Sequence, residues 1–377
     1  MSTDHLTHHT TIHELSERLA RVAQQADAAG VDAVVVSTGA DMQYLVGRSQ
    51  GSHERLTAVV IPSTGEPFMV VPQLELPGWA NSDAQTLGLE MLDWADGDDP
   101  YSVLAAHLGA PTLVMVDDAM TARHVEGLGR ALGCPISAAG ELLTGMRATK
   151  SPDELTALEA VAAAVDRVHG QMAEWLRPGR TETQVGADIA AALEFEGHQR
   201  ADFVIVGSGP NGASPHLEQT ERIIAPGDAV VVDIGGPAPS GYFSDSTRTY
   251  CVGSPADSLF EHVYDIVLTA QDAAFAAATA GNTAASVDAA ARAVITDAGF
   301  GDHFITRTGH GIGLEVHEHP YIVRGNHQPL SPGMAFSIEP GIYLPGRFGV
   351  RIEDIVVIDA DGSPRRLNSS PRHWQLS

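Results

Sequence analysis

Residues 229–250 read AVVVDIGGPAPSGYFSDSTRTY, two strand-forming runs joined by a turn rich in glycine and proline. Asp233 interrupts the first run and Asp245 the second, twelve residues apart and symmetric about Pro239. Facing residues of an antiparallel pair point to the same side of a sheet, so this spacing predicts a hairpin with both carboxylates on one face. A buried carboxylate is costly unless another group offsets its charge. The partner of these two groups must come from another segment of the chain.

Three later segments each place a metal-type ligand among apolar or β-forming neighbours. His310 lies between two glycines in RTGHGIG, Glu339 ends the apolar run MAFSI, and Glu353 lies in the middle of the β-pattern GVRIEDIVVI. Any one of them could be an ordinary salt-bridged or capping residue. With Asp233 and Asp245 they form a set of four carboxylates and one imidazole, which suits Mn²⁺, Co²⁺, Fe²⁺ or Zn²⁺. Because one carboxylate can bridge two cations, the set predicts a two-metal centre that activates water and polarises a carbonyl.

Two nearby patterns imitate other kinds of site. Residues 207–212, GSGPNG, match the dinucleotide-binding pattern G-x-G-x-x-G, but that motif needs a helix directly after the loop to hold the pyrophosphate. Pro210 lies inside the loop and no long helical stretch follows, so a flexible loop leading to His216 is the better interpretation. The run VHEHP is not the helical zinc motif H-E-x-x-H, because position 321 is tyrosine and Pro320 would break the helix.

The net charge and the cysteine content of the chain indicate which partners it can bind and in which cellular compartment it works. The chain has 22 basic and 48 acidic residues, a net charge of −26, which argues against nucleic acid and anionic membranes as partners. Its two cysteines, Cys134 and Cys251, are too few for a disulfide framework and fit a reducing compartment. The polar first residues do not form a signal peptide, and no apolar run approaches the ~18 residues that span a bilayer. We therefore expect a cytoplasmic protein.

The pattern of elements changes character near residue 148. Before it, strand-like and helical runs alternate, which predicts an α/β domain over residues 1–147. The expected elements of this domain are a helix over 12–29, strands in VDAVVVST and TLVMVDD, a hairpin around 63–65 and a helix in ARHVEGLGRALG. After it, Ser151 with Pro152 predicts a helix start, and Thr181 with Gln184 predicts a capping box for a helix to about residue 196. Strands expected at 202–206, 229–234 and 242–251, and helices near 256–280 and 286–298, predict an α+β domain over residues 148–377.

The order of the five candidate ligands, with the motifs GHGIGLEVHEHP, SIEPGIY and VRIED, resembles the pita-bread metallopeptidases. This family includes Xaa-Pro dipeptidase (prolidase), aminopeptidase P and methionine aminopeptidase. The resemblance covers residues 150–360, and MRATKSPDE is similar to the helix that opens the family's catalytic domain. The first 145 residues resemble the creatinase/prolidase N-terminal domain more weakly. The resemblance implies an α/β creatinase-like N-terminal domain followed by an α+β pita-bread catalytic domain.

The resemblance also implies a role for each residue of the set. Asp233 would bind one metal bidentately, Asp245 and Glu353 would bridge both metals, and His310 and Glu339 would complete the second. Glu339 would also move the proton from the attacking, metal-bridged water to the leaving nitrogen.

Three further residues match substrate-contacting positions of the family. His216 resembles the histidine that stabilises the oxyanion, and His317 resembles the one that orients the scissile amide. Arg351 matches the arginine that meets a substrate carboxylate, for which a planar guanidinium is suited.

Within this family the sequence favours an Xaa-Pro dipeptidase that uses two divalent ions, most readily Mn²⁺, on a peptide with proline after the scissile bond. An Xaa-Pro aminopeptidase acting on longer peptides is the alternative, and another hydrolase or a sulfonium lyase is a third. The complete ligand set argues against the metal-independent creatinase reaction and against a non-catalytic binding module. The family implies a homodimer, to which residues 51–55, GSHER, could contribute.

Overall fold

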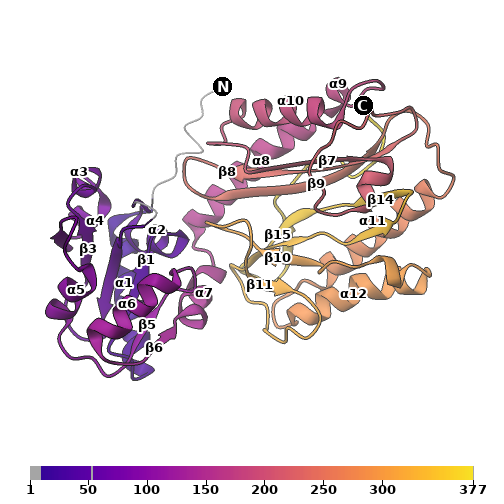
Figure 1. The fold of residues 1–377 in the computed structure, drawn as a ribbon. Coiled ribbons are helices and arrows are strands. Elements are labelled where there is room, and N and C mark those ends of the chain that lie inside the picture. The colour runs from indigo at the N-terminus through magenta and orange to yellow at the C-terminus, as the bar shows by residue number, and fades with distance from the viewer. Residues whose placement is uncertain (1–9, 52–53, 377) are drawn as a thin grey trace. The chain divides into compact units, whose positions relative to one another are not determined.

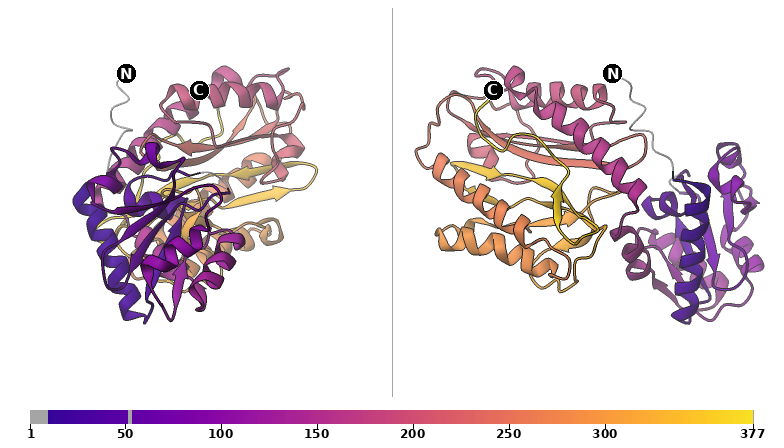
Figure 2. Two further views of the ribbon diagram at one scale, coloured as in Figure 1. Left: turned by 60° about the vertical axis from the view of Figure 1, so that its left-hand side comes forward. Right: turned by 180° about the vertical axis from the view of Figure 1, so that it is seen from behind.

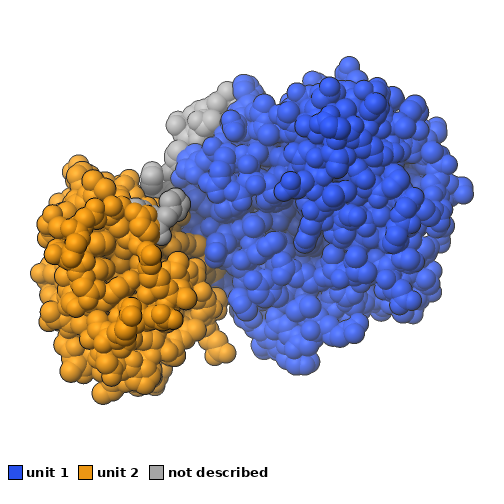
Figure 3. All heavy atoms as spheres, viewed as in Figure 1, with its two compact units in different colours: residues 1–8, 148–377 blue, residues 9–147 orange. Residues whose placement is uncertain are grey.

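The computed structural model describes residues 10–51 and 54–376. The chain divides into two compact units, one formed by residues 9–147 and the other mainly by residues 148–377 (Figure 3). Residues 52 and 53 of the GSHER segment lie outside the described residues.

The first unit is built on a six-stranded mixed sheet with the order β4-β3-β2-β1-β5-β6. Its strands are β1 (Ala33–Ser37), β2 (Ala58–Pro62), β3 (Phe68–Pro72), β4 (Glu90–Trp94), β5 (Val114–Val116) and β6 (Ile136–Ala138). Its helices are α1 (Ile12–Ala28), α2 (Ala40–Val46), α3 (Leu76–Trp79), α4 (Asp83–Thr86), α5 (Pro100–Leu108), α6 (Ala122–Leu132) and α7 (Gly140–Ala148). The predicted α/β class is confirmed, as are the helix α1 and the antiparallel β2–β3 hairpin.

Sequence reasoning did not find the two edge strands of this sheet. Every residue of β1, β2 and β3 is buried, so these strands have continuous apolar runs. In β4 only Trp94 is buried, and in β6 no residue is. Half-exposed strands at a sheet edge therefore lack the pattern that identified the central ones.

The second unit contains three sets of paired strands. A three-stranded sheet joins β7 (Phe203–Ser208), β8 (Ala229–Pro237) and β9 (Phe243–Cys251). A five-stranded sheet has the order β11 (Glu318–Ile322), β10 (Gly309–Gly311), β12 (Ala335–Ile338), β15 (Asp354–Ile358) and β16 (Pro364–Arg366), and β13 (Gly341–Leu344) pairs with β14 (Phe348–Arg351). The helices are α8 (Pro152–His169), α9 (Met172–Trp175), α10 (Glu182–Phe195), α11 (Phe260–Ala277) and α12 (Ala284–Asp297), with short 3₁₀ turns η2 (Gly209–Ala213) and η3 (Gly301–His303).

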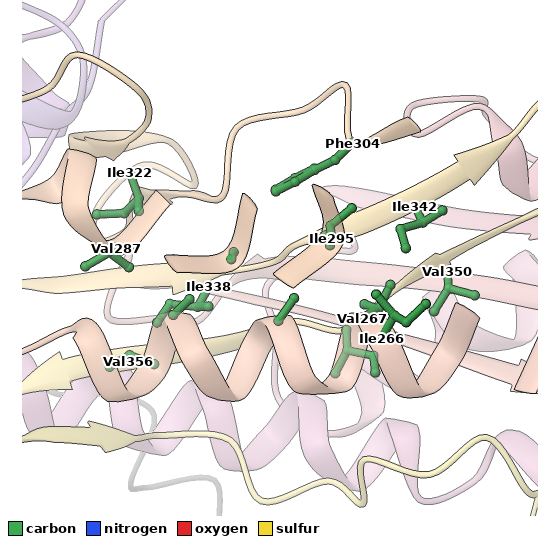
Figure 4. Close-up of a cluster of buried hydrophobic side chains, with 14 of the residues drawn as sticks. Ile266, Val267, Val287, Ile295, Phe304, Ile322, Ile338, Ile342, Val350 and Val356 are labelled. Atoms are coloured by element: carbon green, nitrogen blue, oxygen red, sulfur yellow. The ribbon is translucent and has the colours of Figure 1, made fainter. Parts of the chain in front are cut away.

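Two helix pairs enclose the strands of this unit, one on each side (Figures 1 and 2). Helices α8 and α10 share a core with the three-stranded sheet, to which Val230, Val232 and Ile234 of β8 contribute. Helices α11 and α12 share a second core with β12, β13, β14 and β15, part of which is drawn in Figure 4. Because strand side chains alternate between two faces, the residues between these core positions face the other set of strands.

Helix starts in this unit follow the predicted caps. Ser151 and Glu154 form a reciprocal capping box at α8, and Thr181 and Gln184 form another at α10. The helix that starts after Ser151 ends at His169, and the short α9 follows it. The GSGPNG segment joins two antiparallel strands through η2 and no α-helix, so it is not a dinucleotide-binding crossover. No described helix is both long and apolar enough to span a bilayer.

Candidate active site

The β8–β9 hairpin brings its two carboxylates to the face opposite the helix core. The register differs from the symmetric prediction: Asp245 pairs with Gly235, and Asp233 pairs with Thr247. The carboxylates are therefore diagonal rather than opposite. They still share a face, because the offset is two residues and side chains alternate with period two. Val232 and Ile234, on either side of Asp233, point into the helix core, so Asp233 points away from it.

Glycines on both sides of His310 allow its strand to fit between two others. A Cβ atom on Gly309 would collide with the carbonyl oxygen of Ser337 on β12. One on Gly311 would collide with the carbonyl oxygen of His319 on β11. The sequence G-H-G therefore places one large side chain at a position where the three strands leave no room for others.

The His310 ring is oriented by its own strand and directed at two carboxylates. Its Nδ1 lies 3.1 Å from the carbonyl oxygen of Gly311, which can only accept a hydrogen bond, so Nδ1 carries the proton. Its Nε2 lies 3.1 Å from Glu339 Oε1 and 3.5 Å from Asp245 Oδ2. When a cation binds Nε2, it replaces the proton through which this nitrogen interacts with the two carboxylates.

Glu339 directly follows β12, where Ser337 lies two residues before it on the same face. The Ser337 hydroxyl donates a hydrogen bond to Glu339 Oε1 at 3.1 Å, and the Glu339 backbone donates to Thr308 O at 2.7 Å. Burial acts to raise the pKa of Glu339, but the hydrogen bond and charge of His310 hold that pKa below its usual value. Glu339 is therefore a carboxylate at neutral pH.

Glu353 lies in a break between two strands, not within a strand as its sequence pattern predicted. β14 pairs with β13 and ends at Arg351, whereas β15 pairs with β12 and begins at Asp354. The Glu353 backbone donates to Thr247 O at 3.0 Å, and its Oε2 accepts from Thr247 Oγ1 at 2.8 Å. Because of this break, Glu353 contacts β9 at Thr247, which lies two residues from Asp245.

Arg351 is buried, with 2% of its surface exposed. It donates to Asp233 Oδ2 at 2.6 Å, to the Tyr343 hydroxyl at 2.8 Å and to Thr247 Oγ1 at 3.0 Å. These bonds hold Asp233 in place, and Arg351 also lines the cavity. Its predicted contact with a substrate carboxylate stays a prediction.

Every predicted site residue lines one cavity of about 690 Å³ in the second unit, within the range of small-molecule sites. His216 and His317 lie on its wall at solvent-accessible positions, and the rings of His317 and His310 meet edge-on with centroids 4.2 Å apart. Partial desolvation in the cavity and the charges of His310 and Arg307 lower the pKa of His317 to about 4. His317 is therefore neutral at pH 7.

Comparisons with known proteins identify this arrangement. Residues 156–360 match Metallopeptidase family M24, and residues 18–149 match the Creatinase/Prolidase N-terminal domain. The chain belongs to metallopeptidase family M24. It is therefore a metallopeptidase, with the predicted creatinase-like domain and pita-bread catalytic domain.

Several relatives of this M24 chain are dipeptidases by name. The "Probable dipeptidase PepE" of Mycobacterium tuberculosis (strain ATCC 25618 / H37Rv) is 51% identical over 349 residues, which are 92% of this chain and 93% of that protein. The solved structure of dipeptidase PepE from Mycobacterium ulcerans is 48% identical, with a TM-score of 0.94 over 97% of this chain and 99% of that one. The Xaa-Pro dipeptidase of Lactobacillus helveticus is 35% identical, over 88% of this chain and 91% of that protein.

The donor set of the M24 site fits divalent cations. Ligand atoms of Asp245, His310 and Glu353 lie within 4.8 Å of one another, and all three residues are buried. Asp233 Oδ1 and Glu353 Oε1 are buried without any hydrogen-bond partner. Burial, then the charges of Glu353 and Asp233, raise the pKa of Asp245 well above its usual value. Crowded carboxylates with unused oxygens are stabilised by a positive ion between them.

Sequence reasoning missed the residues that orient the M24 ligands. Thr247 supports both Glu353 and Arg351, Ser337 supports Glu339, and Tyr343 supports Arg351. Thr247 and Ser337 could have been found, because each lies two residues from a ligand on the same strand face. Tyr343 and the cavity-lining Arg307 lie within the motifs SIEPGIY and RTGHGIG, but the sequence alone does not show what their side chains contact.

Proposed function

We propose that this chain hydrolyses the Xaa-Pro bond of dipeptides, with two divalent cations as cofactors. The observation that carries the proposal is the convergence of all eight predicted residues on one cavity, where two buried carboxylate oxygens have no partner. The names of its relatives, PepE dipeptidase and Xaa-Pro dipeptidase, support the substrate class.

The cations would be held by five side chains, Asp233, Asp245, His310, Glu339 and Glu353. When bound, such ions lower the pKa of a water molecule and polarise a carbonyl group. Arg351 positions Asp233 through their 2.6 Å ion pair, so the carboxylate is already oriented when a cation arrives.

Glu339 is suited to carry the proton of the reaction. Hydrolysis requires a base that takes a proton from the attacking water and an acid that returns it to the leaving nitrogen of proline. Glu339 is ionised at neutral pH and held by Ser337 and His310, so it can accept the proton and then donate it.

The two wall histidines can donate hydrogen bonds to the substrate. His216 would donate to the carbonyl oxygen as it gains negative charge in the transition state. His317 is neutral at pH 7, because its pKa is about 4, and would hold the amide beside the ligands. An Xaa-Pro amide has no N–H to donate, so recognition of its proline ring depends on apolar contact. Phe203, Ile205, Ile305 and Val316 provide that wall of the cavity.

The test is proline release from Ala-Pro and Leu-Pro by metal-stripped protein to which Mn²⁺, Co²⁺ or Zn²⁺ is added back. Metal-dependent cleavage of both dipeptides, with Ala-Pro-Ala left intact, is the expected result. Cleavage of Ala-Pro-Ala to Ala and Pro-Ala would replace the proposal with aminopeptidase P activity. No cleavage of any peptide by metal-loaded protein would overturn the substrate class.

We also propose Mn²⁺ as the preferred ion, a homodimer as the assembly and the cytoplasm as the location. An oxygen-rich donor set with one imidazole suits Mn²⁺, and Cys134 and Cys251 are both unpaired, as in a reducing compartment. Greater activity with Zn²⁺ than with Mn²⁺, a light-scattering mass of one chain, or recovery outside the cytoplasmic fraction would contradict the respective proposal.

A further inference from the structure

The cavity contains a second arginine, whose guanidinium is not committed to the metal-site residues. Arg307 lines the cavity beside Thr306 and Ile305. Within residues 10–51 and 54–376, it forms no ion pair with an acidic side chain. Most donors of Arg351 are occupied by protein groups, whereas no side-chain hydrogen bond of Arg307 is found among the described residues.

Aromatic stacking and a fixed backbone hold Arg307 in place. Its guanidinium lies over the Tyr321 ring, 4.7 Å from the centroid, and the His319 ring lies 4.7 Å from the same tyrosine. The neighbouring backbone is anchored, because Thr308 donates to Ile322 O at 3.0 Å and Thr306 O accepts from Arg292. Stacking uses the flat face of a guanidinium and leaves the N–H groups on its edge available.

A negatively charged substrate needs a positive side chain in this cavity, because the cavity wall is acidic. Its wall includes the four carboxylates of the proposed metal site, whose charge bound cations would offset, and Asp202, which repels an anionic substrate. The proline of an Xaa-Pro dipeptide carries a free carboxylate, whereas an internal proline carries an amide there. Arg307 and His317 line the same cavity.

We propose that Arg307, stacked on Tyr321, binds the free C-terminal carboxylate of the dipeptide and thereby selects dipeptides over longer chains. The inference rests on the proposed function and assigns the carboxylate to Arg307 rather than Arg351. A planar guanidinium can donate two parallel hydrogen bonds to the two oxygens of a carboxylate. An uncharged amide has only one such oxygen and cannot accept both bonds.

The test compares Ala-Pro with Ala-Pro amide as substrates of the Mn²⁺-loaded wild type and of Arg307→Gln. Loss of a hydrogen-bonded charge pair lowers kcat/KM for the acid about 10- to 100-fold, mainly through KM. The amide should change less than about threefold, and Arg307→Lys should recover part of the loss. Arg324→Gln is the matched control, because Arg324 is exposed and does not line the cavity. Equal losses on acid and amide would overturn the proposal. So would retained selectivity in Arg307→Gln combined with lost selectivity in Arg351→Met.

A binding measurement separates this inference from the proposed reaction. Metal-stripped wild-type protein is titrated with N-acetylproline and with its amide, and NMR shifts are followed. Tighter binding of the acid, abolished in Arg307→Gln, supports the carboxylate site even where no peptide is cleaved. Equal affinity for acid and amide in the wild type would overturn the site, whatever peptides the enzyme hydrolyses.

Discussion

Replacing Arg351 by methionine tests whether this arginine is a positioning residue for Asp233. Methionine fills much of the space of the arginine stem and removes the charge. The substitution leaves Asp233 Oδ2 without its 2.6 Å partner and the Tyr343 hydroxyl without its 2.8 Å partner. Asp233 Oδ1 has no partner already, so the carboxylate would then be almost uncompensated.

The expected cost follows from the burial of this pair. Arg351 is 2% exposed and the Asp233 side chain 14% exposed. Removing one partner of a buried ion pair costs about 3–5 kcal/mol, because the other charge stays buried and unpaired. Adding Asp233→Asn removes that charge, and the interaction energy between contacting residues is typically about 0.5–3 kcal/mol. The double variant should therefore be more stable than Arg351→Met alone.

Urea unfolding of metal-stripped proteins in chelator measures these differences. Arg324→Met serves as the control, because a substitution of an exposed arginine changes stability by about 0.5 kcal/mol or less. A loss below about 1 kcal/mol for Arg351→Met would refute the reasoning, as would a double variant less stable than the single one. Added Mn²⁺ should stabilise wild type and Arg351→Met, since cations offset the Asp233 charge.

Three other predictions concern the metal ligand Asp245, the cavity-wall residue His216 and the stability of the protein in acid. Asp245→Ala should lose bound metal and activity together; full metal content by mass spectrometry after dialysis would contradict its assignment. His216→Ala should keep its metal but lose about 100-fold in turnover, the scale of one oxyanion donor, and unchanged kcat would make this histidine structural. Burial lowers the pKa of His169 to about 3 and that of His198 to about 4. The unfolded chain therefore binds these protons first, and stability falls by about 4 kcal/mol between pH 6.5 and 4.5. A urea midpoint that does not change over this range would exclude that account.

Local signals in the sequence were sufficient for most elements and for the identity of the ligands. Capping residues at Ser151 and Thr181 and continuous apolar runs in β1, β2 and β8 are properties of short segments. The candidate ligands were recognisable because a charged residue inside a buried strand pattern is costly without a partner. The half-exposed strands β4 and β6 lack any such signal.

Only the tertiary structure decided how the site residues meet. Hairpin register is set by pairing across the turn, so the sequence could not reveal that Asp245 faces Gly235 rather than Asp233. The strand break at Glu353 depends on β14 and β15 pairing with different neighbours. Likewise, Arg351 and Arg307 are both arginines near a ligand in sequence. Contacts from distant strands occupy the donors of Arg351, while Tyr321 supports Arg307 at the cavity wall. Residue types and their order are local properties, whereas the partner available to each charge is set by long-range packing.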